Sequence, residues 1–250
     1  MKPLTNKIAL VTGASRGIGK AIAIRLAQDG AMVMVHYSTS IESAGNALDT
    51  ITQQGGNAVL VHGDFSNMGG VKKICEQADI VLGGRPLDIL INNASVPERI
   101  DNAAITEEQF NQLIEVNLKA PFFLTQKLLN NINNGGRIVN ISSQAARSPH
   151  YKVGPYAMMK AALDSFTVSM ATMLGPRSIT VNSVRPGPTE TDENKQRFEN
   201  EIKRKAIIDQ TALRALGKSN DIAGVVAFLV SPDAGWITGQ HIEVSGGFGL

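Results

Sequence analysis

The chain has little of the chemistry that builds cross-linked or metal-bound proteins. Cys75 is the only cysteine, so no disulfide can form within the chain. The four histidines are scattered and show no spacing typical of metal ligands. We therefore expect no structural metal, and we expect a reducing compartment.

Long apolar runs and a strong excess of one charge are also missing. No stretch approaches the ~18 apolar residues that span a bilayer, and the N-terminal MKPLTNKIALVTG turns polar before it could form a signal peptide. Lys and Arg total 24 against 22 Asp and Glu, and the densest basic stretch, EIKRKAI at 201–207, is short and lies beside acids. The sequence thus predicts a soluble, cytoplasmic protein and argues against membrane or nucleic-acid binding.

The composition that remains suits one aliphatic core. Aromatic residues make up only 5% of the 250 positions, whereas hydrophobic residues make up 43%. This length corresponds to one domain or two small ones, and no linker or internal repeat divides it. We predict a single domain over residues 1–250.

Seven short apolar runs alternate with helical patterns along the chain. The runs occupy residues 7–12, 32–36, 57–62, 87–92, 137–142, 179–184 and 241–244. The first six are nearly continuous hydrophobics, which is typical of strands buried on both faces of a parallel sheet. Helical spacing occurs at 17–29, 106–131, 155–174 and 220–230. The alternation predicts an α/β fold of the Rossmann type, with a doubly wound, mostly parallel seven-stranded sheet and helices on both faces.

The polar stretch at 188–211 breaks this rhythm. It shows no strand pattern, and it follows a strand, which places it near the carboxyl ends of the sheet where ligands bind. We interpret it as a substrate lid, and a solvated helical excursion is the alternative.

A glycine-rich turn follows the first predicted strand and opens the first predicted helix. Gly13, Gly17 and Gly19 stand in G-x3-G-x-G spacing within LVTGASRGIGKAI. Glycines permit a tight turn and let the backbone approach a pyrophosphate, while the helix N-terminus supplies free N–H groups. The turn therefore predicts a dinucleotide site.

The end of the second predicted strand indicates which dinucleotide binds. NAD-binding proteins often carry an acidic residue there, but this chain has His36, Tyr37, Ser38 and Thr39. A carboxylate would repel a 2′-phosphate, whereas hydroxyls and the guanidinium of Arg16 would attract it. NADP(H) is the predicted cofactor, and NAD(H) is the alternative.

Four motifs occur in one order along the chain: TGASRGIG at 12–19, NNAS at 92–95, NISS at 140–143 with YAMMK at 156–160, and RPG at 185–187. In this order the sequence resembles the short-chain dehydrogenase/reductase family, in its branch of roughly 250 residues, and is similar to 3-oxoacyl-carrier-protein reductases. The resemblance implies one NAD(P)-binding domain and an oxidoreductase that acts on C=O and CH–OH groups. Family members are commonly homotetramers built through the helices here near 106–131 and 155–174, so a homotetramer is expected and a homodimer is the alternative.

The resemblance also implies a role for each matching residue. Tyr156 matches the proton donor and acceptor, and Lys160 matches the lysine that lowers the tyrosine pKa and binds the nicotinamide ribose. Ser143 matches the serine that holds the substrate oxygen, and its spacing from the tyrosine favours it over Ser142. Asn117 matches the helix asparagine of a proton relay. The positions implied to contact the cofactor are Gly13, Ser15, Arg16, Gly17, Ile18, Gly19, Tyr37, Ser38, Thr39, Asp64, Phe65, Asn92, Ala94, Tyr156, Lys160, Pro186, Gly187 and Thr189.

The main prediction is reversible, NADP(H)-dependent reduction of a ketone or aldehyde to an alcohol. An NAD-linked alcohol dehydrogenase of the same family and a non-catalytic NADP(H)-binding sensor or scaffold are the alternatives. Ser95 and Ser245 replace a glycine and an acid that the family usually has. We expect Ser95 to reshape the floor of the site slightly without removing a catalytic group. A small free carbonyl, a sugar, a polycyclic ketone and a carrier-bound thioester all remain open as substrates.

Overall fold

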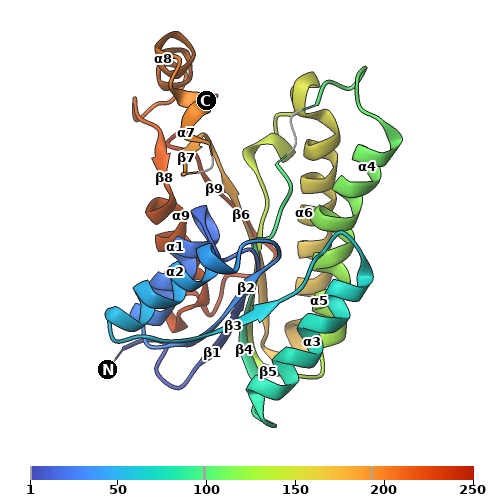
Figure 1. Ribbon diagram of the computed structural model, residues 1–250, viewed down its shortest axis with the longest axis vertical. Coiled ribbons are helices and arrows are strands. Elements are labelled where there is room, and N and C mark those ends of the chain that lie inside the picture. The colour runs from blue at the N-terminus through green and yellow to red at the C-terminus, as the bar shows by residue number, and fades with distance from the viewer. Residues whose placement is uncertain (1, 98–99, 193) are drawn as a thin grey trace.

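The computed structural model describes residues 2–97, 100–192 and 194–250. Within them, seven strands form one parallel sheet in the order β3-β2-β1-β4-β5-β6-β9 (Figure 1). The strands are β1 (Ile8–Val11), β2 (Met32–Tyr37), β3 (Asn57–His62), β4 (Leu87–Asn92), β5 (Ile132–Ile141), β6 (Thr180–Pro186) and β9 (His241–Val244). The predicted doubly wound fold is confirmed, and every strand pair of this sheet is parallel.

Helices cover both faces of the sheet (Figure 1). One face packs against α1 (Gly17–Gln28), α2 (Ile41–Gln53) and α9 (Ser219–Val230). The other packs against α3 (Met68–Leu82), α5 (Ala120–Leu128) and α6 (Gly154–Leu174). Two aliphatic clusters result, one on each side, and their burial supplies the main driving force for folding.

The strand order places a switch point between β1 and β4. The chain runs from β1 outward to β2 and β3, then returns to pair β4 with the other edge of β1. Ligands of such sheets bind beyond the carboxyl ends of the strands at this switch point. The segments that follow β1, β4, β5 and β6 therefore meet at one edge of the sheet.

The helix predicted over 106–131 is interrupted in the structure. It consists of α4 (Glu107–Ile114), a π-helical turn η1 (Glu115–Lys119) and α5. Thr106 caps α4, and it forms a capping box with Gln109. The π turn carries Asn117, and such turns occur frequently at functional sites.

The prediction of no strand in 188–211 was wrong. Thr189–Glu190 forms a short strand, β7, which pairs in parallel with β8 (Gly217–Lys218) outside the main sheet. The pattern was missed because two residues carry no periodicity. The rest of the stretch includes α7 (Lys195–Phe198) and α8 (Glu201–Asp209), while residue 193 lies outside the described residues. Among the described residues, no helix is long and apolar enough to cross a membrane.

Candidate active site

The glycine turn after β1 has the backbone shape that a pyrophosphate cradle needs. Gly13 and Gly17 adopt φ of +61° and +55°, a region that disfavours residues with a Cβ. A Cβ on Gly19 would lie 2.1 Å from the carbonyl oxygen of Gly13, so only glycine lets α1 start this close to the turn. Arg16 is exposed at the N-cap position of α1. These features fit a dinucleotide phosphate at the N-terminus of α1.

Asn93 and Thr12, which the sequence did not single out, hold this turn against β4. The Asn93 amide donates to the carbonyl oxygens of Thr12 at 2.8 Å and Gly13 at 3.0 Å. The Thr12 hydroxyl oxygen accepts from the backbone N–H groups of Asn93 at 2.9 Å and Ala94 at 3.0 Å. The only sequence signal for this contact was the position of Asn93 in NNAS, directly after a predicted buried strand.

Asn92 was predicted to lie beside the cofactor, but its side chain points into the protein. Its side chain is buried and donates to Thr125 Oγ1 at 3.0 Å and to Asn140 Oδ1 at 2.8 Å. Successive side chains of a strand point to opposite faces, so Asn92 is directed into the protein while Asn93 reaches the glycine turn. Among the described residues, its Oδ1 is buried without a hydrogen-bond partner, so we expect the predicted cofactor contact of Asn92 to come from its backbone.

The predicted adenosine-side residues converge at the ends of β2 and β3. Asp64 accepts from the backbone N–H of Ser66 at 2.9 Å and from the Ser66 hydroxyl at 2.7 Å, and these bonds lower the pKa of its carboxyl. Ser38 Oγ lies 3.4 Å from Asp64 Oδ1. Tyr37 lies with its ring 5.0 Å from that of His62. Asp64 is therefore an ionised, exposed acceptor beside the Tyr37–Thr39 segment.

His36, for which we predicted no role, is buried between the ends of β1 and β3. Its Nδ1 accepts from the backbone N–H of Gly13 at 2.9 Å, and its Nε2 lies 2.9 Å from the carbonyl oxygen of Gly63. Its ring stacks on Phe65, with centroids 4.4 Å apart. Burial lowers the pKa of His36 to about 4, so the imidazole is neutral at physiological pH.

The lowered pKa of His36 predicts acid sensitivity of the fold. The unfolded chain binds a proton at this residue below about pH 6.5, whereas the folded chain resists it until about pH 4. The contribution of His36 to stability is therefore full above pH 6.5 and falls toward pH 4, by about 1.4 kcal/mol per pH unit and about 3 kcal/mol in all. Urea unfolding of the wild type and of His36→Asn between pH 7 and 4 measures the difference in slope. His150→Asn, at an exposed histidine, should keep the wild-type slope; parallel curves for wild type and His36→Asn would contradict the prediction.

Tyr156 and Lys160 lie one turn apart at the start of α6. Gly154 and Pro155 begin this helix, and proline is suited to a first turn because its missing N–H has no helical partner there. Lys160 Nζ lies 5.6 Å from the centroid of the Tyr156 ring. It also donates to the carbonyl oxygen of Ile141 at 2.9 Å, which ties α6 to the end of β5. The structure thus joins the helix of Tyr156 to the strand that Ser143 follows.

The two serines after β5 have different environments. Ser142 is buried, and its hydroxyl donates to the Lys160 carbonyl oxygen at 3.2 Å. Ser143 is half-buried, and its Oγ accepts from the backbone N–H of Ala145 at 3.1 Å, which leaves its proton available to a substrate oxygen. This geometry agrees with the preference for Ser143.

Lys160 is a fully buried ammonium with a lowered pKa. Desolvation lowers its pKa to about 8, and the nearby Asp164 carboxylate opposes this shift. The side chain still carries its charge at neutral pH, where it can stabilise a phenolate form of Tyr156. Asp164 itself accepts from Ser183 Oγ at 2.8 Å and from Arg185 Nε at 2.8 Å, which joins α6 to β6.

Asn117 is buried in the π turn, and its side chain is engaged by the segment after β4. Its Oδ1 accepts from the Ser95 hydroxyl at 2.8 Å and from the Val96 N–H at 2.9 Å, and its amide donates to the Val96 carbonyl at 3.1 Å. A glycine in place of Ser95 could not form the first of these bonds. Ser95 therefore adds a hydrogen bond that helps to fix the Asn117 side chain. We had expected Ser95 only to reshape the floor of the site slightly.

The segment after β6 completes this edge of the sheet. Gly187 donates its N–H to the Val244 carbonyl at 3.0 Å, and a Cβ on Gly187 would lie 2.6 Å from Ser245 Cα. Thr189 donates its hydroxyl to the Gly187 carbonyl at 3.0 Å. Pro186, the last residue of β6, and Gly187 are thereby fixed against β9.

Comparisons with known proteins agree with this arrangement. A protein-family model described as "Enoyl-(Acyl carrier protein) reductase" matches residues 13–249. An uncharacterized oxidoreductase of Methylorubrum extorquens is 39% identical over 99% of both chains. The hydroxynaphthalene reductase-like protein Arp2 of Metarhizium robertsii is 36% identical over 98% of this chain and 96% of its own. The crystal structure of the angucycline C-6 ketoreductase LanV with bound NADP has a TM-score of 0.94 and 41% identity, and the match covers 99% of this chain and 97% of that one. The four motifs and these similarities lead to one conclusion: the chain belongs to the short-chain dehydrogenase/reductase family.

Proposed function

We propose that the protein is an NADP(H)-dependent carbonyl reductase in which Tyr156 donates the proton. The observation that carries the proposal is the buried Lys160 ammonium beside the Tyr156 ring, next to the end of β5. The ketoreductase LanV with bound NADP and the hydroxynaphthalene reductase-like Arp2 support the reaction class and the cofactor. By the same similarities, we propose a ketone fused to an aromatic ring system as the substrate class.

The residues divide the reaction between proton transfer and charge stabilisation. Bound NADPH supplies the hydride that the carbonyl carbon receives. The Tyr156 hydroxyl gives its proton to the carbonyl oxygen, and the Lys160 charge brings the tyrosine pKa, ordinarily about 10, closer to working pH. The Ser143 hydroxyl donates a hydrogen bond to the same oxygen and stabilises the negative charge that develops on it. Asn117 and Ser95 order the segment below the site.

A substrate panel tests the proposal. Purified protein is mixed with NADPH, and the loss of absorbance is followed with a bicyclic aromatic ketone, a small aliphatic ketone, a 3-oxoacyl thioester and an α,β-unsaturated thioester. We expect the fastest turnover with the aromatic ketone and none with the unsaturated thioester. If only the unsaturated thioester is turned over, the proposed reaction is wrong and the protein is an enoyl reductase. Tight NADPH binding without turnover of any compound would favour the sensor.

Arg16 should determine the preference for NADPH over NADH. Its exposed guanidinium stands at the N-cap of α1, next to the phosphate cradle. A charge-assisted bond to a 2′-phosphate is worth ~1.5–3 kcal/mol. Arg16→Ala should therefore raise the Kd of NADPH roughly 10-fold or more and leave the Kd of NADH unchanged. Fluorescence titration with both cofactors measures this, with Arg25→Ala at the far end of α1 as the control. Equal weakening of both cofactors would count against the 2′-phosphate contact.

We propose that residues 188–211 act as a substrate lid. All the described residues of α8 are exposed or half-exposed, with Ile202 83% exposed, so the helix has little packing to hold it. Its far end is tied to the C-terminal segment, where Gly249 donates to the Gln210 carbonyl at 3.1 Å. We expect trypsin to cut first in the Lys203–Lys205 region, and NADPH with a substrate ketone to slow this cut several-fold. A cut rate that ligands leave unchanged would argue for the solvated excursion.

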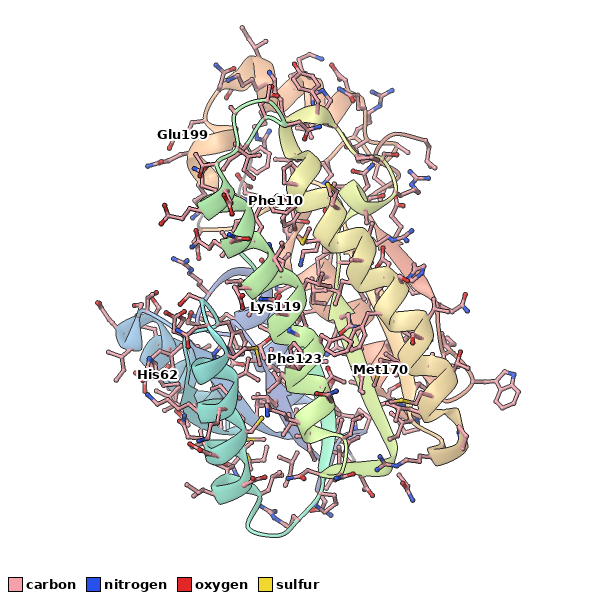
Figure 2. All side chains as sticks on the ribbon, turned by 90° about the vertical axis from the view of Figure 1, so that its right-hand side faces the viewer. His62, Phe110, Lys119, Phe123, Met170 and Glu199 are labelled. Carbon is pink, nitrogen blue, oxygen red and sulfur yellow. The ribbon has the colours of Figure 1, made fainter. Side chains whose placement is uncertain are left out.

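We further propose a cytoplasmic homotetramer built through α5 and α6. Figure 2 shows this face, along which Phe123 and Met170 are labelled. Phe122, Val168 and Met173 expose 38%, 45% and 53% of their surface on these two helices, while Met170 is buried in the core. Exposed apolar side chains along neighbouring helices favour self-association. Light scattering distinguishes a tetramer from a dimer or a monomer.

A further inference from the structure

His36 joins two segments that serve different halves of the proposed cofactor site. The glycine turn at Gly13 would hold the pyrophosphate, and the Gly63–Phe65 segment carries Asp64 toward the adenine end. The segments follow different strands, β1 and β3, which are not neighbours in the sheet because β2 lies between them. The His36 imidazole, near the end of β2, therefore bridges the segments that follow β1 and β3.

The hydrogen bonds specify the tautomer of this imidazole. A carbonyl oxygen only accepts, so Nε2, 2.9 Å from the Gly63 oxygen, carries the proton. Nδ1 is then the acceptor for the Gly13 N–H, also at 2.9 Å. The backbone adds a third link, since Ala14 donates its N–H to the His36 carbonyl at 2.8 Å. Both amides at the start of the glycine turn are thus oriented by one residue.

Packing keeps the ring in this orientation. His36 is 1% exposed, and its ring lies nearly parallel to that of Phe65, at 21° and 4.4 Å. Without the Nδ1 acceptor, the N–H of Gly13 would be a partly buried donor that has lost its partner, in a turn whose positive φ depends on glycine. Such a turn would be free to leave the geometry that fits a pyrophosphate.

We propose that His36 is a positioning residue for the dinucleotide, which in its Nε2–H form holds the glycine turn at the spacing from the Gly63–Phe65 segment that NADP(H) requires. The proposal rests on the proposed cofactor site. His36 acts through Gly13 and Gly63 and has no part in the chemical step. It should therefore determine cofactor affinity and leave turnover at saturating NADPH little changed.

Two variants separate the two hydrogen bonds. In His36→Asn, the amide oxygen stands at the same bond distance from Cα as Nδ1 and can accept from Gly13. In His36→Gln, the amide nitrogen stands where Nε2 was and can donate to Gly63, while the Gly13 bond is lost. Both lose the stacked ring, so a merely structural role would affect both alike.

The measured quantities are the Kd and KM of NADPH, kcat at saturation, and the thermal midpoint of each variant. We expect His36→Gln to raise the Kd and KM roughly tenfold, and His36→Asn to stay within about threefold of the wild type, with kcat similar in all three. Equal affinities in the two variants, or a loss confined to kcat, would overturn the proposal. Failure of the wild type to bind NADPH would instead refute the proposed function.

A measurement on the wild type covers the case in which neither variant folds. Nitrogen NMR of the imidazole should show the Nε2–H tautomer, and the Nδ1 signal should shift when NADP+ is added, while His150 stays unchanged. An Nδ1–H tautomer, or no response to NADP+, would contradict the positioning role.

Discussion

Replacing Tyr156 by Phe should lower carbonyl reduction by about 10³-fold and leave cofactor binding intact. General acid catalysis contributes typically 10²–10⁴-fold to a rate, and the phenol is the only proton source we assign to the carbonyl oxygen. The aromatic ring, which packs 5.6 Å from Lys160 Nζ, is kept in the variant. We therefore expect an unchanged thermal midpoint and an NADPH Kd within about twofold of the wild type, since no buried group loses its packing.

The control for this variant is Tyr151→Phe. Tyr151 is 54% exposed and lies just before α6, so loss of its hydroxyl should leave kcat unchanged. Both variants are assayed by NADPH oxidation with the fastest ketone of the panel and by fluorescence titration with NADPH. If Tyr156→Phe retains more than a tenth of the wild-type kcat, the proton comes from another group. If it also loses NADPH affinity, the change is not confined to the chemical step.

The sheet could be predicted because its strands are buried on both faces. Continuous apolar runs such as 32–36 and 87–92 are typical of strands buried on both faces of a parallel sheet, and both are strands in the structure. The family, predicted from motif order, and the fold, predicted from the alternation of apolar runs and helical patterns, are confirmed by the comparisons. NADP(H)-dependent carbonyl reduction is supported by the similar ketoreductases and is the proposed function. The roles of the individual residues remain predictions, which the variants above test.

Features that depend on a partner distant in the sequence could not be predicted. Asn117 lies in a π turn, and its side chain bonds to Ser95 and Val96. No local sequence pattern predicts such a turn. In the sequence, His36 is only one residue of a predicted strand. Its hydrogen bonds to Gly13 and Gly63 are seen only in the fold. Adjacent Asn92 and Asn93 look equivalent in the sequence, yet the pleat of β4 directs one inward and the other to the glycine turn.

Replacing Lys160 by Met should lower activity strongly while making the protein more stable. The activity loss follows from the removal of the charge that lowers the tyrosine pKa, and we expect it to reach about 10²–10³-fold in kcat/KM. In the wild type, kcat/KM for reduction should also fall as pH rises past about 8, because Lys160 then loses its proton. The Lys160→Met variant should lose this dependence along with its activity.

The stability gain follows from the pKa of the same group. Lys160 is fully buried and its folded pKa is about 8, against about 10.5 unfolded, so at pH 7 the folded state holds an ammonium that burial disfavours. The unfolded chain binds more protons between pH 8 and 10.5, so wild-type stability should rise with pH across that window. Methionine has a similar length and no charge; it loses the bond to Ile141, the attraction to the Asp164 carboxylate and the contact of the ammonium with the Tyr156 ring. We expect a gain of about 1–3 kcal/mol at pH 7, or roughly 2–4 °C in Tm per kcal/mol.

Lys152→Met is the matched control, because Lys152 is exposed in the turn before α6. Its Tm should stay within about 1–2 °C of the wild type, as expected for an exposed position. Calorimetry of the three proteins at pH 7 and pH 9.5 measures both effects, and the gain of Lys160→Met should shrink at the higher pH. A lower Tm for Lys160→Met at both pH values would mean that the bond to Ile141 outweighs the desolvation of the ammonium. A fold that gains stability when it loses this lysine keeps a destabilising charge beside the phenol, which is what a residue retained for catalysis is expected to show.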